Sequence, residues 1–285
     1  MSFLPLFSSR LMASPLVVLT DFHAVTNRAL SYAAGLAEPL QAKLVLLHAR
    51  YDALLAPLDD DLPYAPLNDQ ATDRALQRLA NAQPVPTLVE VSERELPEAV
   101  RAAVLHHHPL LLVLGQPGGA STPAEVLTST AETLLSTVPY PLLLLPALGD
   151  WQAAPPRRLL LAVDGQPFVL HQYQDVLRQL LGVADGTLAV VRVADSSHGR
   201  LGVDAILRTV ATHDLTDELA PELLSEVDNI SVVGGVLAEA ARQHTDLLVV
   251  VARRHSLLGR LFHRSVTAQL IEQSPIPLLV LPAQD

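Results

Sequence analysis

Short apolar runs alternate along the whole chain with longer segments of helical periodicity. Within the runs, apolar residues occupy successive positions rather than every second one. Such strands need cover on both faces, which is typical of a parallel sheet between helices. The pattern predicts strands at 16–20, 44–48, 87–91, 110–114 and 142–145, with helices near 24–38, 72–82, 96–107 and 123–137. In the second half it predicts strands at 159–163, 188–193, 230–233, 247–251 and 278–281.

The second half of the chain repeats the first. Residues 139–147 reappear as 275–283 with seven of nine positions identical, and the first and fourth apolar runs recur in the same order. Between the copies lies a stretch with glycine and two prolines, which is typical of a linker. We therefore predict two homologous domains at 13–147 and 157–284, joined by a linker at 148–156.

The alternation of strands and helices predicts the topology of each domain. Right-handed crossovers give an α/β fold with a doubly wound, five-stranded parallel sheet, Rossmann-like, in the strand order 3-2-1-4-5. Ligands of such sheets bind at the carboxyl ends of the strands, where the order reverses between strands 1 and 4. In the first domain Asp21 follows strand 1, while Gly115 and Gly118 follow strand 4. A carboxylate there can accept hydrogen bonds from adenine or ribose, and glycines let backbone N–H groups approach phosphate.

Composition narrows the classes of partner. The formal net charge of −11 and the pI near 5.4 argue against binding to nucleic acid or an anionic membrane. Cysteine is absent, which excludes disulfides, thiolate metal sites and cysteine nucleophiles. No Gly-Lys-Ser/Thr occurs, so a P-loop is excluded, and no apolar run reaches the ~18 residues of a membrane span. The first eleven residues lack a basic leader, so we expect no signal peptide; Met12 is an alternative start.

These residues resemble the universal stress protein family. The resemblance rests on the segment 18–22 (VLTDF), the Gly-x2-Gly after strand 4, a following serine and the Pro-x-Pro-Leu-Leu-Leu strand. It covers nearly the whole chain as two tandem copies. Nucleotide-binding members carry Gly-x2-Gly-x9-Gly-Ser/Thr, which in the first copy falls on Gly115, Gly118, Thr128 and Ser129, with threonine replacing the third glycine. The resemblance implies that Asp21 lies on the adenine side and that domain 1 binds ATP or another adenine nucleotide.

The second copy departs from this motif. Ala252 and His255 stand where the two glycines belong, and Arg264-Ser265 replaces the Gly-Ser, with one residue fewer between. Only Asp164 remains in place. The loop is basic, so its candidate anion-binding residues are Arg253, Arg254, Arg264 and Ser265, although a solvated basic surface explains the same charges. We expect domain 2 to have lost the nucleotide site.

Several candidates also have purely structural explanations. Asp21 and Asp164 are good helix caps, Gly118-Gly119 is compatible with a flexible loop, and Ser129 and Thr130 are compatible with the cap of the last helix. The run His106–His108 invites a metal interpretation. However, neighbouring side chains on a helix diverge by about 100°, so three in a row do not converge on one ion. We therefore predict no metal site.

The last strand of each copy is apolar and bordered by prolines, although it lies at a sheet edge. Such an edge is either paired or covered by a helix or loop. In the family the last strand commonly forms the dimer contact, which implies that the two copies pair internally about a pseudo-two-fold axis through their last strands. Whether the chain also forms a homodimer stays open.

The sequence therefore predicts a cytoplasmic stress-response protein of the universal stress type, with ATP or another adenine nucleotide bound in domain 1 only. The alternative is an interaction or scaffold protein with the same fold and no nucleotide. For either function, we expect that the protein binds neither nucleic acid nor a membrane. We expect no enzyme and no catalytic residue, because no general base, nucleophile motif or acidic metal cluster accompanies the predicted phosphate loop. The sequence does not identify the stress, the signal or a protein partner.

Overall fold

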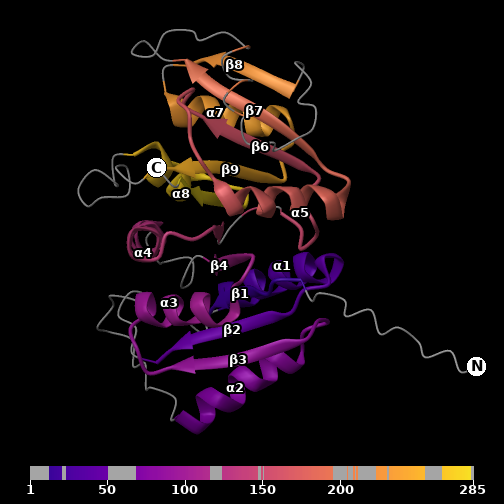
Figure 1. The fold of residues 1–285 in the computed structure, drawn as a ribbon, viewed down its shortest axis with the longest axis vertical. Helices are drawn as coiled ribbons and strands as arrows, with labels where there is room; N and C mark the ends of the chain where they lie inside the picture. The colour runs from indigo at the N-terminus through magenta and orange to yellow at the C-terminus, as the bar shows by residue number, and fades with distance from the viewer. Residues whose placement is uncertain are drawn as a thin grey trace, which may run out of the picture.

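Two similar halves lie one above the other along the long axis of the molecule (Figure 1). The structure is a computed structural model. It describes residues 13–20, 24–50, 69–115, 124–146, 149, 151–194, 204, 208, 210, 223–229, 231–253 and 265–283, without the side chains of 24–27 and 124. Within these ranges, none of the helices has the length and apolar character that crossing a membrane requires.

Each half alternates strands and helices. The first contains β1 (Leu16–Leu19), α1 (Ala24–Leu40), β2 (Leu44–Ala49), α2 (Asp69–Asn81), β3 (Thr87–Ser92), α3 (Leu96–His107), β4 (Leu111–Gly115), α4 (Ala124–Thr137) and β5 (Leu142–Leu145). The second contains β6 (Arg158–Val163), the 3-10 turn η1 (His171–Tyr173), α5 (Gln174–Ala184), β7 (Thr187–Ala194), β8 (Leu224–Asp228), α7 (Val232–Arg242), β9 (Leu247–Ala252), α8 (Val266–Gln273) and β10 (Leu278–Pro282).

The ten strands of the described residues form one sheet in the order β3-β2-β1-β4-β5-β10-β9-β6-β7-β8. Within each half every neighbouring pair is parallel, so each half has the order 3-2-1-4-5. This confirms the predicted α/β fold class with two doubly wound, five-stranded parallel sheets. The point where the strand order reverses lies between β1 and β4 in the first half and between β6 and β9 in the second.

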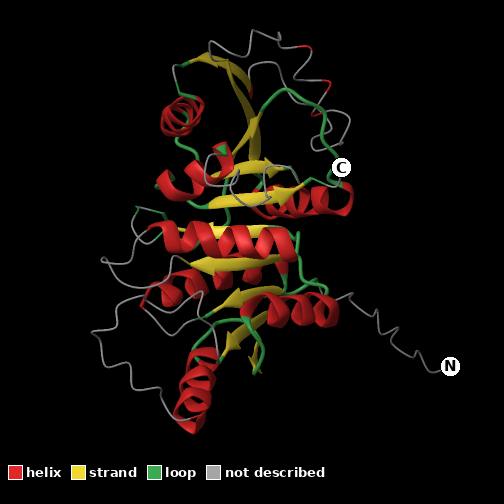
Figure 2. Ribbon diagram, turned by 90° about the vertical axis from the view of Figure 1, so that its left-hand side faces the viewer, coloured by secondary structure: helices red, strands yellow, loops and turns green. Residues whose placement is uncertain are grey.

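Helices cover both faces of the sheet (Figure 2). Alternate residues of each strand face opposite sides, so Leu16 and Val18 join one core while Val17 and Leu19 join the other. Helices α1, α2 and α5 complete the first core, and α3, α4, α7 and α8 complete the second. Because both faces are buried, the central strands are apolar at successive positions.

The two halves join edge to edge. Strands β5 and β10 pair antiparallel, with Leu144 opposite Leu278 and Leu142 opposite Val280. Helix α4 contacts α8 on one face of this junction, and α1 contacts α5 on the other. The linker packs beside it: the Trp151 ring meets Tyr32 of α1 edge-on, with ring centroids 5.4 Å apart, and the Arg28 guanidinium lies 4.2 Å from the Trp151 ring centroid.

One predicted strand is wrong. Val232 and Val233 of the predicted strand 230–233 begin helix α7, and the third strand of this half is β8 instead. Ser231 caps the helix, because its hydroxyl oxygen accepts a hydrogen bond of 3.2 Å from the Gly234 N–H. Strand β8 carries polar residues among its apolar ones, as an edge strand can, so a search for continuous apolar runs passes over it.

Candidate functional site

In domain 1, part of the predicted site lies at the switch point between β1 and β4. Gly115 is the last residue of β4; it is buried and pairs with Leu145 of β5. Thr20, directly after β1, is also buried, and its backbone N–H donates to the Leu47 carbonyl at 3.0 Å. Asp21 and Gly118, the other two residues predicted at this edge, lie outside the described residues. The structure therefore places only Gly115 of this group.

Thr128 and Ser129 lie deeper in the last helix than the motif suggests. Helix α4 begins at Ala124, so both residues belong to its second turn, and neither Ser129 nor Thr130 caps it. Thr128 is buried, and the Ser129 hydroxyl donates to the Val126 carbonyl at 3.0 Å. Anions bind at the free N–H groups of a first helical turn, and amides in a second turn already have partners within the helix. Phosphate contact by the backbone amides of these two residues is therefore not supported.

In domain 2, an arginine side chain forms an ion pair with the aspartate at the switch point. Asp164 follows β6 and Arg253 follows β9. The guanidinium binds both carboxylate oxygens, with Nε to Oδ2 and Nη2 to Oδ1 each at 3.1 Å. It also donates to the carbonyls of Gln166 (3.0 Å) and Pro167 (2.9 Å). The Arg253 side chain is only 12% exposed, so this fork spans the crevice and uses the carboxylate that would otherwise receive a ligand.

Strand register corrects the alignment of the two motifs. Leu16 of β1 pairs with Leu111, and the equivalent Leu159 of β6 pairs with Leu247. The last strands give the same correspondence, because Leu112 pairs with Leu142 and Leu248 with Leu278. The connections between the fourth and fifth strands therefore have equal lengths in the two halves, so their sequence positions align at a constant offset.

This register changes which residues of domain 2 are equivalent to the two glycines of the domain 1 motif. Gly115 corresponds to Val251 and Gly118 to Arg254, rather than to Ala252 and His255. The position of Arg253 is taken in domain 1 by Pro117, whose side chain cannot form an ion pair. The sequence analysis missed Arg253 as the partner of Asp164. A constant offset counted from the repeated last strands would have placed it correctly.

Domain 2 retains a cavity at this edge. It has a volume of about 420 Å³, within the usual size range of small-molecule pockets. Its walls are largely apolar, with Asp164, Arg192, Arg253 and Ser265 contributing polar groups. Ser265 caps α8, since its hydroxyl oxygen accepts a hydrogen bond of 3.1 Å from the Ala268 N–H. The sequence did not predict this cavity; it predicted only that domain 2 has lost the nucleotide site.

Of the four candidate anion-binding residues, the structure places two. Arg253 and Ser265 both line the cavity, but each is engaged within the protein: Arg253 binds Asp164, and Ser265 caps a helix. Arg254 and Arg264 lie outside the described residues. A second arginine in the wall, Arg192, is also paired, with Nη1 at 2.5 Å from the Glu226 carboxylate. The described cations of this cavity therefore already have acidic partners.

Comparison with known proteins identifies the family. The model of the universal stress protein family matches twice, over residues 12–146 and 156–282. The chain belongs to the universal stress protein family. Since the two matches follow one another along the chain, it is a tandem universal stress protein, as the sequence resemblance predicted. No curated protein matches it.

Solved structures share the tandem fold. A universal stress protein from Archaeoglobus fulgidus DSM 4304 is 15% identical over 94% of this chain and 98% of its own, with a TM-score of 0.64. The structure of a putative universal stress protein from Pseudomonas aeruginosa UCBPP-PA14 is 16% identical over 96% of this chain and 95% of its own, with a TM-score of 0.58. A universal stress protein in complex with cAMP covers 46% of this chain and 100% of its own at 18% identity, with a TM-score of 0.35. The first two likenesses show the fold alone, and none of the three transfers a ligand to this chain.

Proposed function

We propose that this universal stress protein is a cytoplasmic stress-response protein that binds ATP or another adenine nucleotide in domain 1 only. It acts by binding, without a catalytic step. The candidate contacts are Asp21 on the adenine side and the backbone at Gly115 and Gly118 near the phosphates. The positions of Thr128 and Ser129 in the second turn of α4 remove their backbone amides from the proposed contacts.

One observation supports the proposed difference in nucleotide binding between the domains. The Arg253 guanidinium neutralises Asp164 and hydrogen-bonds to both its oxygens. A nucleotide in domain 2 would have to displace this fork and leave a mostly buried guanidinium without its partner, which is costly. Domain 1 has Pro117 at the equivalent sequence position, so that position supplies no arginine for Asp21.

The hydrogen bond of the Ser129 hydroxyl within α4 favours a second function. If the Ser129 hydroxyl stays on the Val126 carbonyl, the first domain lacks one of the motif's phosphate contacts. The protein would then act as an interaction or scaffold protein without nucleotide. In that case we expect a stable partner to be recovered without added ATP, and no nucleotide to be released from the denatured protein.

Calorimetric titration of ATP into the full chain tests the proposal. We expect weak binding with one site per chain. Asp21→Asn should weaken the binding at least about tenfold, because it removes one charge-assisted hydrogen bond. Gly118→Val should abolish binding, because a branched side chain blocks the approach of phosphate to the backbone.

Asp164→Asn is the matched control, since it makes the same change at the equivalent position of domain 2. It should leave ATP affinity unchanged. Equal weakening by Asp164→Asn and Asp21→Asn would contradict binding in domain 1 only. The absence of heat at millimolar ATP would contradict nucleotide binding altogether and favour the interaction function. Sustained phosphate release from ATP, lost in Asp21→Asn, would contradict a role without catalysis.

A further inference from the structure

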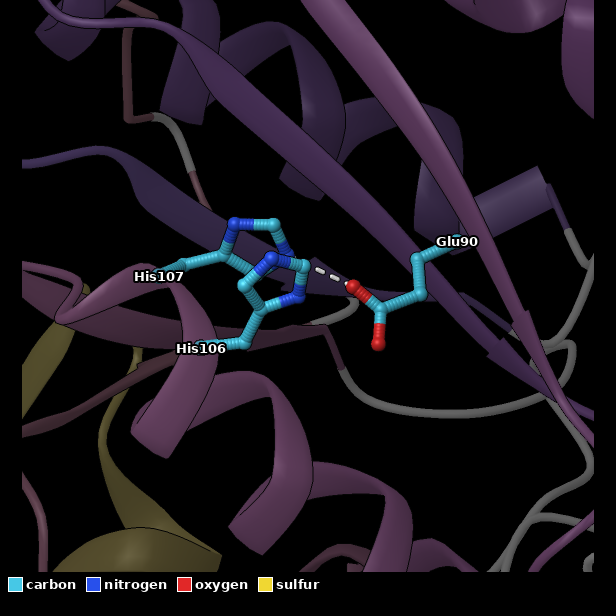
Figure 3. Close-up of side chains that lie close together, drawn as sticks. All are labelled: Glu90, His106 and His107. Carbon is cyan, nitrogen blue, oxygen red and sulfur yellow. Dashed lines mark hydrogen bonds and ion pairs between the residues drawn. The ribbon is translucent and has the colours of Figure 1, made fainter.

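Three potential metal ligands meet at the outer edge of domain 1. Glu90 lies on β3, the edge strand of the sheet, and His106 and His107 form the last turn of α3. Figure 3 shows the Glu90 carboxylate extending from the strand toward the two imidazole rings at the end of the helix. This group lies well away from the switch point, because β2 and β1 separate β3 from β4.

The two histidine rings do not diverge as neighbouring helical side chains usually do. Their centroids are 4.4 Å apart and their planes differ by 22°, so the rings stack. The His107 Nε2 lies 2.6 Å from Glu90 Oε2. One ring nitrogen of each histidine and one carboxylate oxygen all lie within 4.8 Å of one another. The sequence argument against convergence considered three consecutive histidines on one helix and did not anticipate a ligand from a neighbouring strand.

The surroundings favour a cation at this point. The carbonyl end of a helix carries a partial negative charge, and both histidines belong to the last turn of α3. The Glu90 carboxylate adds a full negative charge. His107 and Glu90 are largely shielded from solvent, with side-chain exposures of 11% and 29%, so the donors are partly desolvated and held in place. His106 is exposed and leaves the group open to solvent on one side.

We propose that Glu90, His106 and His107 bind a divalent transition metal ion, with Zn²⁺ as the reference ligand. Two imidazole nitrogens and one carboxylate oxygen are a donor set that suits Zn²⁺ and its neighbours in the first transition row. Three protein ligands leave a fourth position of the tetrahedron for water, on the exposed side of His106. A histidine binds a metal through an unprotonated ring nitrogen, so the metal would replace the hydrogen bond between His107 Nε2 and Glu90 Oε2.

The geometry requires only small movements. Ligand atoms about 2.0–2.1 Å from a tetrahedral zinc ion lie roughly 3.3 Å from each other. The Nε2–Oε2 pair, now 2.6 Å apart, must therefore separate by about 0.7 Å, and the most distant pair must approach by no more than about 1.5 Å. Side-chain rotation has to supply these shifts, and the exposed His106 ring has to turn out of its stack on His107 so that both ring nitrogens face the ion.

The test is a Zn²⁺ titration of the full chain followed by calorimetry, with Co²⁺ absorption in the visible range as a second readout. The wild type should bind with a component of one ion per chain, and Co²⁺ should give the intense absorption of a four- or five-coordinate ion. His106→Ala removes an exposed ligand without affecting the core. His106→Ala and Glu90→Gln, each made alone, should lower the Zn²⁺ affinity of this component at least about tenfold and remove the Co²⁺ absorption band.

His108→Asn is the matched control. His108 is the C-cap of α3, at φ 45°, a conformation that asparagine tolerates, and its side chain is not part of the group. The control should bind Zn²⁺ like the wild type. The proposal is overturned if His106→Ala and Glu90→Gln bind Zn²⁺ as the wild type does, or if His108→Asn loses as much affinity as they do.

Discussion

At the scale of single residues, the sequence located positions but not partners. Asp164 could be placed at the end of a strand because the apolar run before it ends there. Its pairing with Arg253 was missed, because the two motifs were aligned one residue away from the register that the strands adopt. Ser129 shows the same limit: its place in the motif was readable, but Ala124 and Glu125 extend the helix and turn a candidate ligand into an interior helical residue.

Glu239 provides a prediction at this scale. Its buried carboxylate accepts hydrogen bonds from Arg242 (2.6 and 2.8 Å), Ser225 (2.8 Å) and Gln243 (2.5 Å) and so connects α7 to β8. The Arg242 hydrogen bonds, helped by the others against the effect of burial, lower the pKa of Glu239 to about 2. Its ordinary pKa is 4.5. A lowered folded-state pKa means stabilisation that is complete above the ordinary pKa and lost as pH falls through the lowered one.

Glu239→Gln should therefore destabilise the protein at pH 7 by on the order of 3 kcal/mol. Urea unfolding of both proteins should show that this difference shrinks as pH falls from about 4.5 toward about 2. A difference that stays constant over that window would contradict the assigned role of the carboxylate.

At the scale of elements, apolar runs located nine of the ten strands within a few residues. Most of these strands are apolar at successive positions because both of their faces are buried, as in β1 and β9. They failed at β8, where the sheet ends and polar residues are tolerated. Val232 and Val233 were misassigned because two adjacent valines suggest a strand, whereas the Ser231 cap and packing against β7 favour the helix.

Two helical glycines give opposite predictions. A Cβ on Gly35 of α1 would lie 2.3 Å from the carbonyl oxygen of Ala153 in the linker, whereas a Cβ on Gly182 of α5 would meet no atom within 4 Å. Alanine normally stabilises a helix by roughly 0.5–1 kcal/mol relative to glycine. Gly182→Ala should therefore raise the free energy of unfolding by about that amount.

Gly35→Ala should instead lower the free energy of unfolding by about 1–3 kcal/mol, because helix α1 or the linker must move to relieve the contact. Denaturant unfolding of the two variants against the wild type measures both effects. If Gly35→Ala stabilises the protein as much as Gly182→Ala does, the linker does not pack on α1 as described.

At the scale of the whole molecule, the repeat in the sequence predicted two copies of one domain. The structure adds how they combine: β5 and β10 run antiparallel, so the strands of one half point opposite to those of the other. The carboxyl ends of the two sets of strands therefore lie at opposite ends of the strand direction. Gly115 and Asp164 therefore lie at opposite ends of the strand direction and cannot contribute to one composite site.

The pairing of the last strands is the central claim, because it sets the positions of the two switch points. The natural chain has no cysteine, so introduced pairs report directly on distance. Leu143 and Leu279 are opposed in the register, and directly opposed antiparallel residues lie about 4.5–5.5 Å apart at Cα, within reach of a disulfide. Residues two positions out of register lie about 7–8 Å apart and should not be bridged.

The decisive measurement is disulfide formation in the L143C/L279C variant under mild oxidation, read by intact mass and by thiol titration after denaturation. The account predicts a bridge in this variant and none in L145C/L279C, which places a cysteine on the same face of β5 but out of register. Free thiols in L143C/L279C, or equal bridging in both variants, would contradict a single ten-stranded sheet joined through β5 and β10.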